Sequence, residues 1–331
     1  MSTHLLSACG EGAVSYSLGA WANGLTEWTD GDTAYLSIAF TWKLDEAYRR
    51  AQWFKAMGMR VVAGGPALFQ PKLRRHHLHE IAEIPTKIAI IDGKPKEIGA
   101  DAPGGEAVQR HNPMATYASR GCPVGCSFCI VPWMEGKTFT LLPDFPVRPV
   151  LCDNNLSALD ARYQDHIVGR YQAEGVPLLD ANSGFEPRTF DEEVLARWTP
   201  INRGPWRFAY DDAADGQHVA RVMRMLDKVG VSARRRQVYT LIGNEPFEAC
   251  MDRIRQVIAW GGEPYAQPFM KLNALVYRPH VRFDWTEHRL RQVQRWVNAP
   301  AKIWRKVPFD QYDASIKTID APDARQMEFV K

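Results

Sequence analysis

Three cysteines stand close together in one short segment of the chain. Cys122, Cys126 and Cys129 fall within eight residues, in the order Cys-Pro-Val-Gly-Cys-Ser-Phe-Cys. Thiolates at this spacing can bind one metal centre, and a structural zinc site or a cluster held wholly by protein normally takes four ligands. Three thiolates therefore leave one position of the centre open for a cofactor or a substrate. The other interpretation is a zinc knuckle that a distant His or Cys completes.

The segment resembles the cysteine motif of the radical S-adenosylmethionine (SAM) superfamily. That motif is Cys-x-x-x-Cys-x-aromatic-Cys, and Phe128 is the aromatic residue here. The resemblance implies that the three thiolates hold a [4Fe-4S] cluster, that SAM chelates its fourth iron, and that Phe128 lies near the adenine. It also implies reduction by a protein such as flavodoxin or ferredoxin. SAM would then be cleaved to a 5′-deoxyadenosyl radical that abstracts a hydrogen from the substrate.

Polar residues follow the second strand expected after the N-terminal domain. The superfamily commonly has Gly-Gly-Glu at this place and binds the SAM amino group there, whereas this chain has Asp153, Asn154 and Asn155. Their side-chain oxygens supply the acceptors that an amino group needs. The alternative interpretation is an Asx turn that caps a helix.

The resemblance places further SAM contacts after the fourth and fifth expected strands. Gly243 and Glu245 belong to the turn after the fifth strand, which in the superfamily lies near the adenine. Arg207 and Asp211, at the fourth strand, would reach the carboxylate or the ribose of SAM. Ordinary turn, capping and surface roles are the alternatives for all four residues.

The exit of the third expected strand is unusually polar. Asn182, Glu186 and Arg188 follow one another within residues 180–188. If this strand belongs to a barrel, its exit points into the barrel mouth. We interpret the three side chains as contacts to the substrate or to SAM, with a solvated loop as the alternative.

Alternating strands and helices must position these residues. Strands are expected at 114–119, 149–152, 176–180, 206–210, 237–242 and 265–269. Helical patterns lie between most of them, at 191–198, 215–229 and 246–260 among others. This rhythm predicts a partial (β/α)6 barrel of the TIM type, with its chemistry at the carboxyl ends of the strands.

A separate α/β unit is expected before the barrel. A strand at 34–40, a helix at 45–57 and a strand at 60–63 form a βαβ pattern, which favours a parallel pair. The turn-rich residues 101–105 mark the expected boundary. The unit looks like a reduced form of the cobalamin-binding Rossmann domain that precedes many radical SAM domains. The pattern Asp-x-His-x-x-Gly, which supplies the axial ligand there, is missing from this sequence, so cobalamin is not favoured.

We therefore expect an α/β protein in three parts: a Rossmann-like domain (1–110), a radical SAM barrel (111–280) and a short helical C-terminal tail (281–331). The tail combines basic residues with two tryptophans: Arg289, Arg291, Arg295, Lys302, Arg305, Lys306, Trp296 and Trp304. Such a pattern can follow a phosphate backbone and stack on a base. The alternative is an amphipathic helix at 286–297 whose tryptophans pack on the barrel while its arginines stay in water.

The composition excludes several classes of protein. A chain with 45% hydrophobic and 24% charged residues is neither mainly disordered nor collagen-like. It has no run of about 18 apolar residues, so we expect no membrane span. The N-terminus lacks the basic start and apolar run of a signal peptide, which favours the cytoplasm. A net charge of +3 argues against nucleic-acid binding through bulk charge, although a basic patch is compatible with it.

The expected function is that of a radical SAM enzyme that modifies an unreactive C–H position. The tail and the resemblance to RNA-modifying relatives favour a nucleobase or nucleotide as substrate. One alternative is a cobalamin-dependent radical SAM methyltransferase, and another is a non-catalytic iron–sulfur or zinc protein that binds nucleic acid. A methylthiotransferase would need three cysteines in its N-terminal domain, where this chain has only Cys9.

Overall fold

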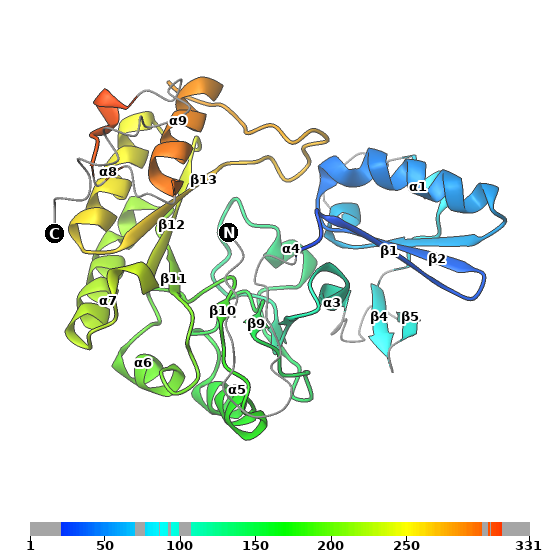
Figure 1. The fold of residues 1–331 in the computed structure, drawn as a ribbon, viewed down its shortest axis with the longest axis horizontal. Helices are drawn as coiled ribbons and strands as arrows, with labels where there is room; N and C mark the ends of the chain where they lie inside the picture. The colour runs from blue at the N-terminus through cyan, green and yellow to red at the C-terminus, as the bar shows by residue number, and fades with distance from the viewer. Residues whose placement is uncertain are drawn as a thin grey trace, which may run out of the picture. The chain divides into compact units, whose positions relative to one another are not determined.

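The computed structural model describes residues 21–69, 77–85, 87–91, 94–98, 107–299, 304 and 306–312. The chain is a mixed α/β protein that divides into two compact units (Figure 1). One unit contains the described residues up to Pro205 together with Leu272–Tyr277. The other contains Trp206–Lys271 and the described residues from Arg278 onward. The domain boundaries expected near residues 110 and 280 stay predictions, and the expected linker at 101–105 lies outside the described residues.

The first unit begins with a small mixed sheet. β1 (Leu25–Asp30) pairs antiparallel with β2 (Thr33–Ile38), and β2 pairs in parallel with β3 (Arg60–Gly64). The connection from β2 to β3 contains α1 (Leu44–Ala56), so the predicted βαβ pattern is confirmed. Every residue of β2 is buried, because β2 is the central strand and α1 packs against the sheet. β1 was not predicted, and the sheet has three strands in the described part of the chain.

Shorter elements continue the first unit. They are two 3-10 turns (Thr41–Lys43 and Pro66–Phe69), α2 (Leu78–Ile81), the antiparallel pair β4 (Lys87–Ile91) and β5 (Lys94–Ile98), and α3 (Ala107–His111). The apolar run at 87–91 is therefore a strand of a hairpin.

A second sheet of the first unit carries the polar segments singled out above. β6 (Ala115–Thr116), β9 (Val150–Leu151) and β10 (Asp180–Ala181) are parallel and lie in the order β10-β9-β6. β7 (Ser119–Arg120) and β8 (Thr140–Leu141) form a short antiparallel pair, and α4 covers Val131–Met134. α5 (Ala161–Glu174) begins after Asp160, which caps it, and α6 (Glu192–Trp198) begins after Asp191, which does the same.

The second unit is built on longer parallel strands. β11 (Trp206–Ala209), β12 (Arg236–Ile242) and β13 (Glu263–Pro268) lie in the order β11-β12-β13. α7 (Gly216–Lys228) and α8 (Phe247–Ala259) occupy the two connections, close to the helices predicted there. Short 3-10 turns lie at Ala213–Asp215, Ala233–Arg235 and Phe309–Gln311.

The tail of the second unit begins with α9 (Glu287–Asn298), as predicted. Trp296 is buried with Leu290 and Val293, and its indole N–H donates to the Val307 carbonyl. The amphipathic interpretation of this helix is confirmed, and Trp296 is not available to stack on a base. Lys302 and Arg305 lie outside the described residues.

All six predicted barrel strands occur, as parallel strands in chain order within two three-stranded sheets. No sheet closes into a barrel within the described part of the chain. None of the helices described at 21–312 has the length and apolar character needed to cross a membrane.

Candidate cofactor site

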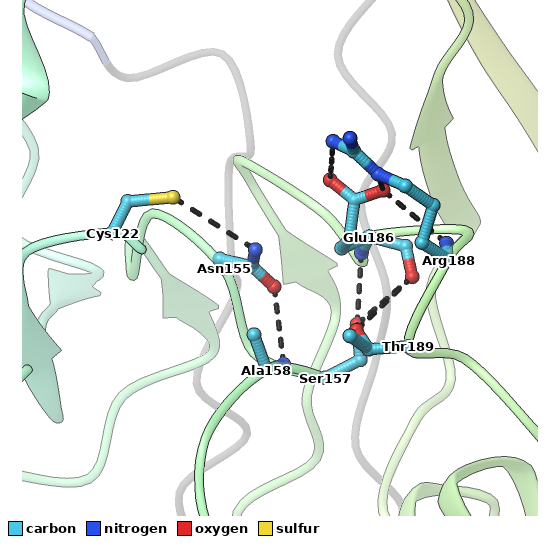
Figure 2. A network of polar contacts seen from close by, with 7 residues as sticks. All are labelled: Cys122, Asn155, Ser157, Ala158, Glu186, Arg188 and Thr189. Atoms are coloured by element: carbon cyan, nitrogen blue, oxygen red, sulfur yellow. Dashed lines mark hydrogen bonds and ion pairs between the residues drawn. The ribbon is translucent and has the colours of Figure 1, made fainter. Parts of the chain in front are cut away.

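The three cysteines lie on the loop that follows β7, which comes two residues after β6 in the chain. The neighbouring strands β9 and β10 end at Leu151 and Ala181, and polar segments follow both. Because parallel strands end at the same edge of a sheet, these segments meet at one edge of β10-β9-β6. Figure 2 shows this meeting: Cys122 comes from the first loop, Asn155 from the second and Glu186 from the third.

The thiols are held in a tight turn near the surface. The Cys129 amide donates to the Cys126 carbonyl at 3.0 Å, Cys126 is exposed, and Cys122 and Cys129 are half-buried. Desolvation by the loop raises the pKa of the Cys126 thiol to about 11, and the charges of Cys129 and Cys122 add to this effect. Burial also raises the pKa of Cys129. The thiols of Cys126 and Cys129 are therefore protonated at neutral pH, and a cation that binds them must displace protons.

The donor set fits an iron–sulfur cluster. Cysteine thiolates are the usual protein ligands of such clusters, and each thiolate binds a different iron. Across the described ranges, no three His, Cys, Asp or Glu side chains gather closely enough to hold a single metal ion.

Asn155 connects the second loop to the cysteine loop. Its Nδ2 group lies 3.8 Å from the Cys122 Sγ atom and can donate a hydrogen bond to it, while its Oδ1 atom accepts from the Ala158 amide at 3.1 Å (Figure 2). The second contact, between Asn155 and Ala158, is typical of the turn that the sequence analysis gave as the alternative to SAM binding. The first contact joins the second loop to the cysteine loop at Cys122.

Glu135 holds the base of the cysteine loop, a role that the sequence analysis did not predict. Its carboxylate accepts from the Gly121 amide at 3.0 Å and from Asn154 Nδ2 at 2.6 Å, and it pairs with Arg120. Arg120 in turn lies 3.9 Å over the ring of Tyr117. Only 10% of the Glu135 side chain is exposed, so these contacts satisfy a charge that is almost fully removed from water.

Asp153 lies beneath the loop and is fully buried. Its carboxylate accepts from the Ala118 amide at 2.8 Å and from the Ser119 hydroxyl. Burial raises its pKa to about 6, and the hydrogen bonds from Ser119 and Ala118 oppose that rise. Both carboxylate oxygens thus accept hydrogen bonds inside the protein. These bonds join the segment before the cysteine loop to the residues that follow β9.

The third loop brings an ion pair close to the thiols. Arg188 donates from Nε and Nη2 to the Glu186 carboxylate, at 2.7 and 3.1 Å. Ser157 accepts from the Glu186 amide at 2.8 Å, and Thr189 donates to Ser157 at 3.0 Å, which ties this loop to the second (Figure 2). The charge of Glu186 raises the pKa of Cys126 and that of Arg188 lowers it, so the pair acts on the thiol electrostatically.

The remaining predicted residues are placed as follows. Phe128 is half-buried within the cysteine loop. In the second unit, Arg207 donates to Gln237 at 3.2 Å, and Asp211 accepts from the Leu241 amide at 2.8 Å. Gly243 has φ of 90°. Glu245 pairs with Arg253. Arg207, Asp211 and Glu245 therefore have structural contacts within their own unit.

No known family model matches the chain, and no curated protein matches it.

Proposed function

We propose that this protein is a radical SAM enzyme whose [4Fe-4S] cluster is held by Cys122, Cys126 and Cys129. The observation that carries the proposal is the position of the three thiols. They lie on the loop that follows β7, at the sheet edge where β9 and β10 end and the next two loops begin. Ligand sites of parallel α/β sheets lie at this edge. The order of strands within each sheet also supports the partial (β/α)6 barrel that the resemblance implies.

When bound, the cluster would supply the electron that cleaves SAM to methionine and a 5′-deoxyadenosyl radical, which abstracts a hydrogen from the substrate. The protein's own contribution begins with binding. Three thiolates hold three positions, and the sequence supplies no fourth cysteine in the loop, which leaves room for SAM. Asn155 donates toward the Cys122 sulfur and so helps to fix its position.

The chain also holds the cysteine loop in place. Asp153 accepts from the Ala118 amide before the loop, and Glu135, which follows the loop, accepts from the Gly121 amide that precedes Cys122. These contacts leave the thiols with little freedom, so less entropy is lost when they bind a metal centre. Glu186 and Arg188 lie near Cys126 and present a carboxylate and a guanidinium on the neighbouring loop. Those two groups can orient a zwitterionic ligand such as SAM.

The test is anaerobic reconstitution with iron and sulfide, followed by dithionite in place of the protein reductant, and then SAM. The proposal predicts 5′-deoxyadenosine in mass spectra of the wild-type reaction and none in the reaction of Cys126→Ala. The matched control is Cys250→Ala, because Cys250 is a buried cysteine of the second unit. Equal 5′-deoxyadenosine from wild type and Cys126→Ala would contradict the proposal.

A further inference from the structure

Phe283 has an unusual backbone and an unusual environment. Its φ angle is 54°, and no other non-glycine residue in the described ranges has a positive φ. L-residues with bulky side chains rarely adopt this conformation, and it persists at functional sites where the surroundings hold it. The ring is also 58% exposed, so burial of the ring does not compensate for the strained backbone.

One cation lies beside this ring, and a second lies near the neighbouring His280. The guanidinium carbon of Arg282 lies 5.1 Å from the centre of the Phe283 ring. The pKa of His280 is lowered, first by burial and then by the charges of Lys271 and Arg282, which places both cations near one imidazole. Lys271 and Arg282 are exposed, and neither forms an ion pair within the described part of the chain.

This surface lies at the carboxyl edge of the sheet β11-β12-β13. The His280 amide donates to the Phe269 carbonyl, and the Phe269 amide donates to the Ile242 carbonyl at the end of β12, both at 2.9 Å. A Cβ atom on Gly243 would lie 3.4 Å from the His280 carbonyl oxygen. The segment 271–291 also has five Lys or Arg residues against two Asp or Glu. Positive charge and an exposed ring therefore meet where parallel sheets bind ligands.

We propose that Lys271, Arg282 and Phe283 bind single-stranded nucleic acid. Phe283 stacks on a base, and the two cations contact the phosphates on either side of it. An exposed aromatic ring next to basic side chains is the combination that holds single strands, because every base has a face that can stack. An acidic polypeptide would use the cations and leave the ring without a partner. The proposal goes beyond the proposed function and does not depend on the cluster, since it concerns binding alone.

The experiment measures fluorescence anisotropy of a fluorescein-labelled RNA of about 15 uridines with the full-length protein. Phe283→Gly removes the ring and permits the positive φ, so it separates stacking from folding. Lys271→Gln combined with Arg282→Gln removes the two charges. Lys228→Gln is the matched control, because Lys228 is an exposed lysine at the end of α7 in the same unit.

The proposal predicts that Phe283→Gly weakens binding about tenfold, the size of one lost base stack, without lowering the unfolding midpoint. The double variant should weaken binding and reduce the slope of log K against log salt by about 1.4, which corresponds to two phosphate contacts on a single strand. Lys228→Gln should bind like wild type.

Three outcomes would overturn the proposal. One is wild-type affinity in Phe283→Gly. Another is an equal loss in Lys228→Gln and in the double variant. The third is binding of polyglutamate in place of the RNA, which would assign the surface to an acidic polypeptide. Each readout is independent of SAM cleavage, so failure here is distinguishable from failure of the proposed enzyme activity.

Discussion

The two parallel sheets have the same strand order but hold their loops in different ways. β6, β9 and β10 contribute two paired residues each, whereas β12 contributes seven. At the first sheet, hydrogen bonds that the Asp153 and Glu135 carboxylates accept from backbone amides fix the loop. At the second sheet, an apolar core that includes Ile242, Met251 and Ile254 supports the strand ends.

We infer from this difference that the two sheet edges have different roles. Side-chain hydrogen bonds can hold a polar loop in place and still leave thiols at the surface, because they need no apolar cover. Apolar packing supplies stability but would bury the ligands. We therefore expect substitutions at the first sheet edge to change cofactor binding, and substitutions at the second to change stability.

The largest expected effect separates the cysteines of the two units. Cys122→Ala, Cys126→Ala and Cys129→Ala should each reduce iron and sulfide in the reconstituted protein from about four of each to nearly none. Cys250→Ala should keep the full content. Iron and acid-labile sulfide assays measure both. Full iron content in all three loop variants would show that this loop does not hold the cluster.

Arg253 tests the second unit. It is buried on α8, donates to the Leu241 carbonyl at 3.0 Å and pairs with Glu245, whose side chain is 35% exposed. Arg253→Met should lower the free energy of unfolding by about 3 kcal/mol, at the low end for a broken buried pair, and leave the iron content unchanged.

Urea titration of Arg253→Met measures that loss, and Arg255→Met, on the exposed face of the same helix, is its control. A loss of iron that exceeds the loss of folded protein would show that the two edges do not divide their roles in this way.

Asp153 gives the first edge a dependence on pH. Its pKa is raised from 3.8 to about 6 in the folded protein, so the folded state binds more protons than the unfolded state between these values. The stability that this group contributes is present below about pH 4 and is lost as the pH rises to about 6, by at most about 3 kcal/mol. Asp153→Asn stays neutral and should lack this decline.

Urea unfolding of wild type and Asp153→Asn at several pH values between about 4 and 7 tests this prediction. An identical decline in both proteins would assign it to other groups. SAM affinity measured on the same variant also separates two roles of Asp153, because a buried anchor should leave that affinity unchanged while a direct ligand of the amino group should not.

Glu135 allows a comparison within the first unit between a mostly buried ion pair and an exposed one. Glu135→Ala leaves the Gly121 amide and Arg120 without their acceptor and should lower the free energy of unfolding by about 2 kcal/mol. Glu83→Ala, which breaks the exposed pair with Arg60, should produce no measurable change. Comparable losses in the two variants would show that Glu135 has no special place in the loop.

Strands and helices with a regular apolar pattern were predicted well from the sequence, whereas individual side-chain contacts were not. All six barrel strands and the helices at 191–198, 215–229 and 246–260 follow from apolar periodicity and terminal Gly or Asp residues, and each occurs near its predicted place. β1 was missed because Thr26 and Glu27 break its apolar pattern, although Gly31 and Asp32 supply a two-residue turn typical of a hairpin.

The three cysteines were singled out from the sequence, whereas the side chains that hold their loop were not. The cysteines are adjacent in sequence, so their spacing alone indicates a shared centre. Glu135 contacts residues 14 and 19 positions away, and no local pattern distinguishes it from a solvated glutamate. Asp153 was predicted as a ligand contact because it follows a strand, yet only the fold reveals that it points beneath the loop. Phe283 likewise reveals its backbone only in three dimensions.

The central claim is that the cysteine loop holds a cluster with an open position for SAM. Electron paramagnetic resonance of the reconstituted, dithionite-reduced protein tests it most directly, with and without SAM. The account predicts a reduced-cluster signal whose g values change when SAM is added, and no such signal in Cys126→Ala. Identical spectra with and without SAM, in protein shown to carry a full [4Fe-4S] complement, would contradict it.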